Sequence, residues 1–417
     1  SFAEDCMTVH DDKRSITVKL PEATGSSDNA KGSWSFRYDA VLHNASQETV
    51  YNETVQPVVQ SVLQGYNGTV LCYGQTGAGK TFTQIGSTAT YAHRGIAPRA
   101  ISDVFQYVQE HPQFEASIGV SYLEIYNDTL VDLLATLPSA QAQTESLGLI
   151  EDASGGTHVK GLRVEKVKDE EAALNLLFEG ETNRSIANHQ LNAKSTRGHA
   201  IFTIYLQIRS RVESSDKVVR CRMNVVDLAG SERLKKTDTM GELRAESMSI
   251  NRSLSYLEQV VVALASKSRT HTPYRQSKLT HLLKDAIGGN SKTLLIANIY
   301  GEMAHLEETI STLQFAARLR SVTNIASVNE QPDPQLLIKK YEREIAELKR
   351  ELAMHDSLAN RSRILYEPYS EMQRGALTSQ LQSYLEHQTD DVPIESVRQM
   401  RELLISARTL YEQKQSE

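Results

Sequence analysis

One junction early in the chain constrains the fold more than any other feature. The apolar run GTVLCY at residues 68–73 predicts a buried strand, and the glycine-rich sequence GQTGAGKT follows it directly at residues 74–81. This octapeptide has the G-x-x-x-x-G-K-[ST] pattern of a phosphate-binding loop, in the strand-to-helix context that such a loop needs. The sequence therefore predicts a site for a nucleoside triphosphate.

Each residue of this loop has a chemical reason to be there. Glycines let successive backbone N–H groups point at phosphates, and the N-terminus of the following helix adds a favourable dipole. Lys80 is expected to reach the β and γ phosphates, and the Thr81 hydroxyl to ligate Mg2+. The alternative is an accidental glycine-rich turn. The predicted cofactor-binding residues are Gly74, Gln75, Thr76, Gly77, Ala78, Gly79, Lys80 and Thr81.

Size, charge and cysteine content narrow the class of protein. A chain of 417 residues predicts one large domain plus an appendage. The net charge of −7 argues against a generic nucleic-acid binder but permits a local basic face. Three cysteines, Cys6, Cys72 and Cys221, favour a reducing compartment over a disulfide scaffold. With no membrane-length apolar stretch and an acidic start, the sequence predicts a soluble intracellular protein.

Strand-like and helix-like segments alternate along the first three quarters of the chain. Strands are predicted at 68–73, 117–126, 199–208, 222–227 and 292–300, and helices near 95–108, 170–186, 244–265 and 279–286. This alternation favours an α/β fold in which helices cover both faces of a central, mainly parallel sheet.

Two further segments have the composition of nucleotide switches. The segment DLAGSE at residues 227–232 ends an apolar strand with a carboxylate, so Asp227 is expected to hold Mg2+ through water and the Gly230 N–H to sense the γ-phosphate. The segment NAKSTRGH at 192–199 places two hydroxyls and a guanidinium before another strand. Each segment alone could be an ordinary polar loop. Together with the phosphate loop they make that explanation improbable.

These motifs, in this order, resemble the kinesin motor domain, whose pattern is a G-Q-T-x-x-G-K-T loop, an N-x-x-S-S-R-S-H switch and a D-L-A-G-S-E switch. The resemblance covers residues 35 to about 329. It includes GYNGT at 65–69, LEIYN at 123–127, INRSL at 250–254 and PYRQSKLT at 273–280. It implies the phosphate-loop motor fold, ATP and ADP as ligands with Mg2+, and microtubule-stimulated ATP hydrolysis.

The resemblance assigns roles to individual positions. Thr196 would ligate Mg2+ beside Thr81 and Asp227, and Ser195 would lie near the γ-phosphate and the attacking water. Arg197 and Glu232 would form the ion pair between the switches, with Glu232 orienting water while Lys80 offsets phosphate charge. Phe82 would lie against the adenine, and a buried core aromatic is the alternative. The implied catalytic residues are Glu232, Arg197, Ser195, Gly230 and Lys80.

Two departures from the family pattern stand out. Gly198 replaces a serine, which removes a hydrogen-bond donor and loosens the backbone, so switch closure and the hydrolysis rate are in question. No R-x-R-P adenine clamp occurs near the start, so we expect the first strand of the domain to be missing from this sequence.

Local positive charge marks a predicted microtubule-binding face. In the family these segments face an acidic track, so basic residues would supply steering and salt-sensitive affinity. A merely solvated surface is the alternative, chiefly for the run at 160–168. The predicted track-binding residues are Lys235, Lys236, Arg252, Arg275, Lys278 and Lys160.

The chain divides, on this interpretation, into a motor domain at 1–320, a neck linker at 321–330, a neck helix at 331–356 and a helical appendage at 357–417. Apolar residues at 338, 341, 345, 348 and 352 fit either a short coiled coil, and thus a homodimer, or a lone amphipathic helix. A neck after the motor implies plus-end direction.

The segments 178–184 and 353–361 look most like the kinesin-9 family of ciliary and flagellar motors. That likeness implies an axonemal microtubule, with axonemal proteins as further partners, in the cytoskeleton of a cilium or flagellum. The alternative is a structural kinesin clamped on a microtubule with a slow or stalled ATPase cycle.

Overall fold

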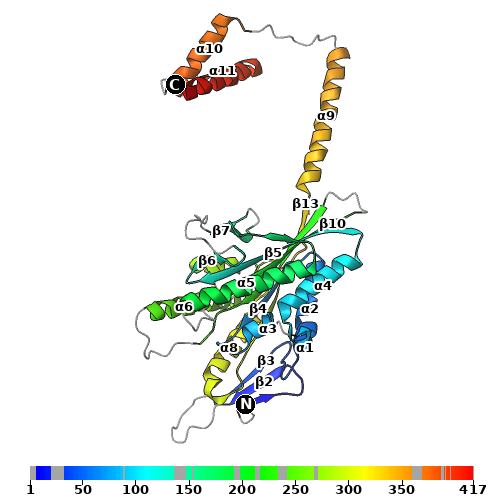
Figure 1. Ribbon diagram of the computed structural model, residues 1–417, viewed down its shortest axis with the longest axis vertical. Coiled ribbons are helices and arrows are strands. Elements are labelled where there is room, and N and C mark those ends of the chain that lie inside the picture. Colours follow the sequence, from blue (N-terminus) through cyan, green and yellow to red (C-terminus); the bar gives the residue numbers. More distant parts are fainter. Residues whose placement is uncertain are drawn as a thin grey trace. The chain divides into compact units, whose positions relative to one another are not determined.

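The computed structural model describes residues 6–19, 32–87, 90–135, 147–152, 155–191, 198–211, 217–232, 242–266, 271–358, 369–386, 389, 391–394 and 396–416. It contains two compact units, Ser1–Leu337 and Ile338–Glu417 (Figure 1). The first unit holds the phosphate loop and the described part of the switches.

A mixed sheet forms the centre of the first unit. Its strands lie in the order β12 (Lys292–Ala297), β4 (Gly68–Tyr73), β11 (Lys217–Asp227), β10 (His199–Ser210), β5 (Phe114–Tyr126) and β6 (Thr129–Asp132), with β9 (Glu165–Val167) beside β5 and β13 (Glu330–Pro332) beside β11. β4 runs parallel to both β12 and β11, and β10 runs antiparallel to β11 and β5. The five predicted strands are all present.

Helices cover both faces of this sheet because side chains alternate along each strand. Val70 and Cys72 of β4 face a core built with α2 (Gln56–Leu63), α4 (Ile96–Glu110) and α5 (Glu170–Leu191). Leu71 and Tyr73 face the opposite core, which includes α6 (Glu242–Ala265), α7 (Lys278–Leu282) and α8 (Leu306–Leu319). Short helices complete the unit: α1 (Gln47–Val50), a π-helix (Tyr51–Val55), α3 (Lys80–Gln84) and 3-10 turns at Tyr91–His93, Tyr274–Gln276 and Met303–His305. The predicted α/β fold with helices on both faces of a central sheet is confirmed; parallel pairing is confined to β12, β4 and β11, and the other described pairs of this sheet are antiparallel.

Two smaller sheets were not anticipated. β1 (Met7–Val9), β2 (Ser15–Lys19) and β3 (Ser33–Arg37) form an antiparallel sheet whose Ile16 and Val18 pack with Leu306 and Ile310 at the start of α8. β7 (Gly148–Glu151) and β8 (Thr157–Lys160) form a separate hairpin. All three cysteines are buried, free thiols.

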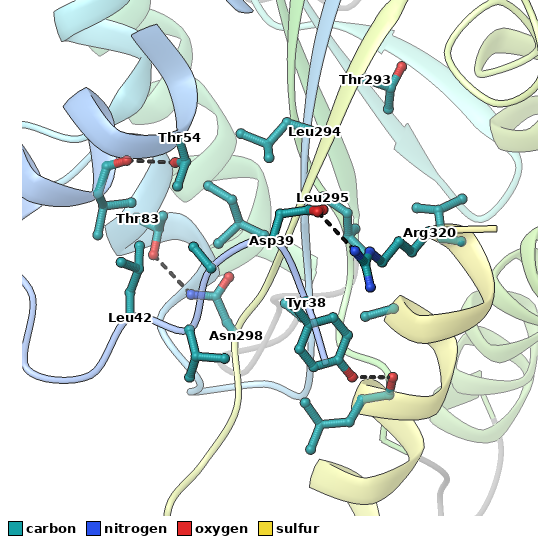
Figure 2. A pocket seen from close by; sticks show the side chains of 18 of the residues that line it. Tyr38, Asp39, Leu42, Thr54, Thr83, Thr293, Leu294, Leu295, Asn298 and Arg320 are labelled. Carbon is teal, nitrogen blue, oxygen red and sulfur yellow. Dashed lines mark hydrogen bonds and ion pairs between the residues drawn. The ribbon is translucent and has the colours of Figure 1, made fainter. Parts of the chain in front are cut away.

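The edge strand β12 differs from its neighbour β4. Every residue of β4 is buried, whereas Thr293 to Ala297 are only half-buried. A cavity of about 720 Å³ runs along β12, lined by Tyr38, Leu294, Asn298 and Arg320 among others (Figure 2). Among the described strands only β4 pairs with β12. An additional strand would find open backbone partners along this edge.

Helices follow the motor core. α9 (Pro334–Leu358) begins after β13, and its apolar residues Ile338, Tyr341, Ile345, Leu348 and Leu352 are 51% to 63% exposed. α10 (Glu371–Leu385) packs against α11 (Val397–Ser416), where Leu377 and Leu403 are buried. None of the helices in the described part of the chain is long and apolar enough to cross a membrane.

Candidate nucleotide-binding site

The phosphate loop connects β4 to α3 in a conformation that requires its glycines. Gly74 has φ 150°, and a Cβ there would lie 2.0 Å from the Asn298 carbonyl oxygen. Gly79 has φ 95° and precedes Lys80, the first residue of α3. Left-handed backbone of this kind strains any residue with a side chain. The loop therefore has the curled backbone that the sequence pattern predicts.

Lys80 is buried at the base of the loop, with 6% of its surface exposed. Its ammonium group donates to the carbonyl oxygens of Gly74 and Gln75, at 2.9 Å each. Burial lowers the pKa of Lys80, and the charges of Asp227 and Glu232 act in the opposite direction. The Lys80 ammonium group is thus held against the backbone of the loop by hydrogen bonds that phosphate oxygens can replace.

Thr81 and Asp227 come together as predicted for a metal site. The Thr81 hydroxyl donates to Asp227 Oδ2 at 2.6 Å, and Asp227 Oδ1 is buried without a hydrogen-bond partner among the described residues. Mg2+ favours hard oxygen ligands and usually keeps several of its waters. The described residues contain no cluster of three His, Cys, Asp or Glu side chains that would hold a metal alone. One hydroxyl and one carboxylate therefore fit Mg2+ that is shared with water and phosphate.

A buried charge network behind Asp227 was missed in the sequence. Arg184 of α5 lies 3.0 Å from Asp227 Oδ2 and 3.6 Å from both Glu124 Oε1 and Glu181 Oε1. Tyr122 donates a hydrogen bond to Glu181. Burial raises the pKa of Glu124, although Arg184 opposes that shift. The partners of Arg184 come from β5 and β11 as well as its own helix, so only the i,i+3 pair with Glu181 had a sequence signal.

The second switch contacts the phosphate loop directly. The Glu232 carboxylate accepts hydrogen bonds from the Thr76 N–H at 2.9 Å and from the Thr76 hydroxyl at 2.6 Å, and the Ser231 N–H donates to the Gly74 carbonyl at 3.1 Å. A Cβ on Gly230 would lie 2.3 Å from both Glu232 Oε2 and Thr76 Oγ1. Glycine at 230 is therefore required for this approach.

The first switch is described only from Gly198 onward. Ser195, Thr196 and Arg197 lie outside the described residues, so their predicted roles stay predictions. His199 links the switches, because its Nδ1 accepts from the Ala229 N–H at 3.0 Å and its Nε2 therefore donates to Ser253 at 2.8 Å. Burial lowers the pKa of His199 to about 3.

Gly198 lies against a buried carboxyl group, and the side chain of Phe82 is exposed. A Cβ on Gly198 would lie 2.1 Å from Glu124 Oε1, so this buried carboxyl group takes the space beside the glycine. Phe82 is 54% exposed, which makes the core alternative wrong. Gln47 donates to the Phe82 carbonyl at 2.6 Å and fixes the backbone there. The Phe82 ring is open to a stacking ligand.

The predicted track-binding residues are only partly visible. Lys235 and Lys236 lie outside the described residues, whereas Lys160 at the end of β8 and Arg252 on α6 are exposed. Arg275 hydrogen-bonds to Glu151 Oε1 at 3.0 Å, and His281 and Lys284 share the same carboxylate. Lys278 has no ion pair with any described residue. Arg275 is thus partly neutralised.

Known proteins resemble this chain in sequence along nearly its full length. The family model described as "Kinesin motor domain" matches residues 3–322. The chain is 47% identical, over its full length and 53% of the relative, to "Kinesin-like protein KIF9" of Homo sapiens. It is 44% identical, over 96% of its length and 52% of the relative, to "Kinesin-like protein KLP1" of Chlamydomonas reinhardtii. The chain thus spans about half the length of these relatives.

Solved structures agree with the sequence relatives. One is described as a fast kinesin, with TM-score 0.69 and 35% identity, and it covers 79% of this chain and 88% of its own. Another is a KIF14 dimer described as a complex with AMP-PNP and a microtubule, with TM-score 0.68 and 34% identity over 78% of this chain and 90% of its own. The expected likeness to kinesin-9 is confirmed by the KIF9 relatives. The chain belongs to the kinesin motor-domain family.

Proposed function

We propose that this chain is a microtubule motor that hydrolyses ATP to ADP and phosphate. The observation that carries the proposal is the contact between the second switch and the phosphate loop, in which Glu232 accepts two hydrogen bonds from Thr76. A γ-phosphate in the loop would compete for these donors, so the switch must respond to nucleotide. A relative described as bound to AMP-PNP and a microtubule supports ATP and tubulin as ligands.

The residues of the site have distinct tasks in this proposal. Lys80 and the loop amides bind the phosphates, while Thr81, Thr196 and a water held by Asp227 would hold Mg2+. That ion, when bound, offsets negative charge on the β and γ phosphates. Glu232 and Ser195 would orient the attacking water, and Glu232 would accept a proton from that water through a relay. Gly230 and Arg197 would close the switches over the γ-phosphate.

In this proposal, force production depends on the neck linker at residues 321–330. The segment lies along the motor unit, where the Ile325 N–H donates to the Gly289 carbonyl at 3.0 Å and the Asn329 N–H to the Gly65 carbonyl at 2.9 Å. We infer that this docking follows switch closure and drives plus-end-directed movement. Work in a cilium or flagellum is proposed from the likeness of segments 178–184 and 353–361 to kinesin-9, and KIF9 is among the relatives.

The neck helix α9 supports a further proposal, that of a homodimer. Its exposed apolar residues recur at spacings of three and four, which suits a short coiled coil with a second copy.

The second candidate function is a structural axonemal kinesin with a slow or stalled ATPase cycle. The glycine at position 198, where the family pattern has serine, favours this candidate.

Steady-state ATP turnover, measured with and without microtubules, tests the proposal. We expect microtubules to raise turnover strongly, and single-molecule imaging should then show directed movement on the same filaments. Microtubule binding without stimulation or movement would favour the structural clamp. ATP turnover without microtubule affinity would contradict both candidates. The matched control is Lys80→Ala, which should abolish nucleotide binding and with it both turnover and movement.

A further inference from the structure

The chain beyond the neck linker is held to the motor unit differently from the linker itself. Asn324 donates its side-chain N–H groups to the carbonyls of Ala286 and Ser291, at 2.8 Å each, so the linker is fixed by dense hydrogen bonding. The next element, β13, pairs antiparallel with β11, but its three residues are exposed. Pro332 also lacks the N–H that a ladder needs. Backbone pairing and apolar burial therefore hold this end of the chain weakly.

Asp333, directly after this exposed strand, is nevertheless buried, with 2% of its surface exposed. It forms an ion pair and a hydrogen bond with Arg209 of β10. The Arg209 side chain is 28% exposed and also lies 4.0 Å from Glu115, its cross-strand neighbour on β5. A second pair, Lys217 with Glu330 at 2.9 Å, lies nearby but has 66% and 48% exposed side chains.

Burial makes these two pairs unequal. A buried carboxylate is costly unless a cation compensates it, whereas an exposed pair gains little because water solvates both partners. If residues 330–333 leave the sheet, the Asp333 carboxylate returns to water. The Arg209 guanidinium then still has its ion pair with Glu115 and its contact with solvent. The Arg209–Asp333 pair can therefore exist only while β13 is in place.

We propose that Arg209 and Asp333 form a charge latch that closes when the neck docks and that extends the docked segment from Asn329 to Asp333. The proposal rests on the nucleotide-dependent docking proposed above. The latch has a second consequence, because the Asp333 carbonyl accepts the Leu337 N–H at 2.9 Å in the first turn of α9. Closing the latch fixes the residue at which the neck helix begins.

The test uses a spin label on the full chain, bound to microtubules with a non-hydrolysable ATP analogue. Gln331→Cys places the label on the exposed strand β13, and the three native cysteines are buried and thus protected. Arg209→Met should lower the ratio of immobile to mobile label by at least about tenfold, because it removes the cation paired with the buried Asp333 carboxylate. The matched control Lys217→Met removes the exposed pair and should change the ratio by less than about threefold.

A double variant separates the latch from a general effect of losing Arg209. Arg209→Met with Asp333→Asn removes the buried negative charge together with its cation and should recover part of the immobile fraction. No recovery, or equal effects of Arg209→Met and Lys217→Met, would overturn the latch. A label equally immobile in every nucleotide state of the parent protein would overturn nucleotide-dependent docking. The latch would then be judged by whether Arg209→Met still releases the label. Thermal unfolding of each variant checks that the motor unit stays folded.

Discussion

Charged side chains at the two functional ends of the motor unit differ in burial and in partners. Lys80, Asp227 and Arg184 at the nucleotide site are at least nine-tenths buried; Asp227 pairs with Arg184, and Lys80 donates to the loop carbonyls of Gly74 and Gln75. Arg275 on the predicted track face is 77% exposed and has one carboxylate partner that it shares. Removing one member of a buried set leaves an uncompensated charge, whereas exposed pairs are worth about 0–1 kcal/mol. We therefore expect large effects at the first end and graded ones at the second.

The largest effect should come from Lys80→Ala. Loss of the ammonium removes the positive charge that the loop offers to phosphate oxygens, while Asp227 keeps its ion pair with Arg184. We expect affinity for a fluorescent ATP analogue to fall at least about 100-fold. Lys278→Ala is the matched control, a lysine lost from the exposed end, and should leave nucleotide affinity unchanged. Equal nucleotide affinity in Lys80→Ala and the parent protein would rule out the phosphate-loop assignment.

Glu232→Ala should separate binding from hydrolysis. In the proposed mechanism its carboxylate orients water and helps to close the switches, so turnover should fall at least about 100-fold. Nucleotide affinity should hold or rise, because Glu232 now occupies the Thr76 donors. Single-turnover hydrolysis and analogue titration measure the two quantities. Unchanged turnover with weakened affinity would make Glu232 a binding residue instead.

Acid should weaken the folded state through His199. Its pKa of about 3 in the folded protein lies below the ordinary value of 6.5, so the unfolded chain binds the proton first and stability is lost as pH falls through 6.5 toward 3. Between pH 7 and pH 5 this one group should cost about 2 kcal/mol of unfolding free energy. Denaturant titrations of the parent and of His199→Gln at both pH values measure the share of this loss that His199 causes. Equal losses of unfolding free energy in the two proteins would show that His199 is not its cause.

The sequence predicted the nucleotide site well because its signals are local. Strand β4, the glycine turn and Lys80 are contiguous, and the pattern states their geometry directly. Asp227 was predicted to hold the metal because it is a carboxylate that ends an apolar strand, and the structure shows that this strand runs parallel to β4. The pairing of Thr81 with Asp227 follows from that register.

Other features could not be read from spacing because they join distant segments. Arg184 meets Glu124 and Asp227 only after three elements assemble, and Glu151 neutralises Arg275 from a hairpin that the strand pattern did not reveal. The small sheet β1–β3 was missed because its strands are short and lack long apolar runs. The motif and the local charge predicted Arg275 as a track cation, but they could not reveal its pairing with Glu151, which lies 124 residues away in the sequence.

Substitutions at Gly198 test how tightly the buried end is packed. Gly198→Ala forces the Glu124 carboxyl group to move and should cost about 1–3 kcal/mol of unfolding free energy. Gly198→Ser adds a hydroxyl that can donate to Glu124 Oε1, which lacks a hydrogen-bond partner among the described residues, and should recover about 1 kcal/mol. The difference between the two variants should vanish when Glu124 is alanine. A marked rise in microtubule-stimulated turnover with serine would identify the glycine as a brake on switch closure.

The smallest effects are expected at the exposed end, where they can be ranked by pairing. Arg275→Ala with Lys278→Ala should weaken microtubule affinity several-fold and flatten its salt dependence, while turnover without filaments stays near the parent value. Lys278→Ala alone should weaken microtubule affinity more than Arg275→Ala alone, because Glu151 already offsets the charge of Arg275. Hydrogen bonds from His281 and Arg275 hold the pKa of Glu151 at about 2, so the carboxylate is ionised at neutral pH.

Glu151→Gln removes that negative charge and should therefore strengthen microtubule binding slightly, by less than about fivefold, at low salt. Co-sedimentation over a range of salt concentrations measures all four variants on one scale. A fall in basal turnover with the double substitution would mean that these residues support the nucleotide end after all. The expected difference between the buried nucleotide site and the exposed track face would then be wrong. Stronger binding by Glu151→Gln at low salt that disappears at high salt would instead show that the exposed charges act on the track through the solvent.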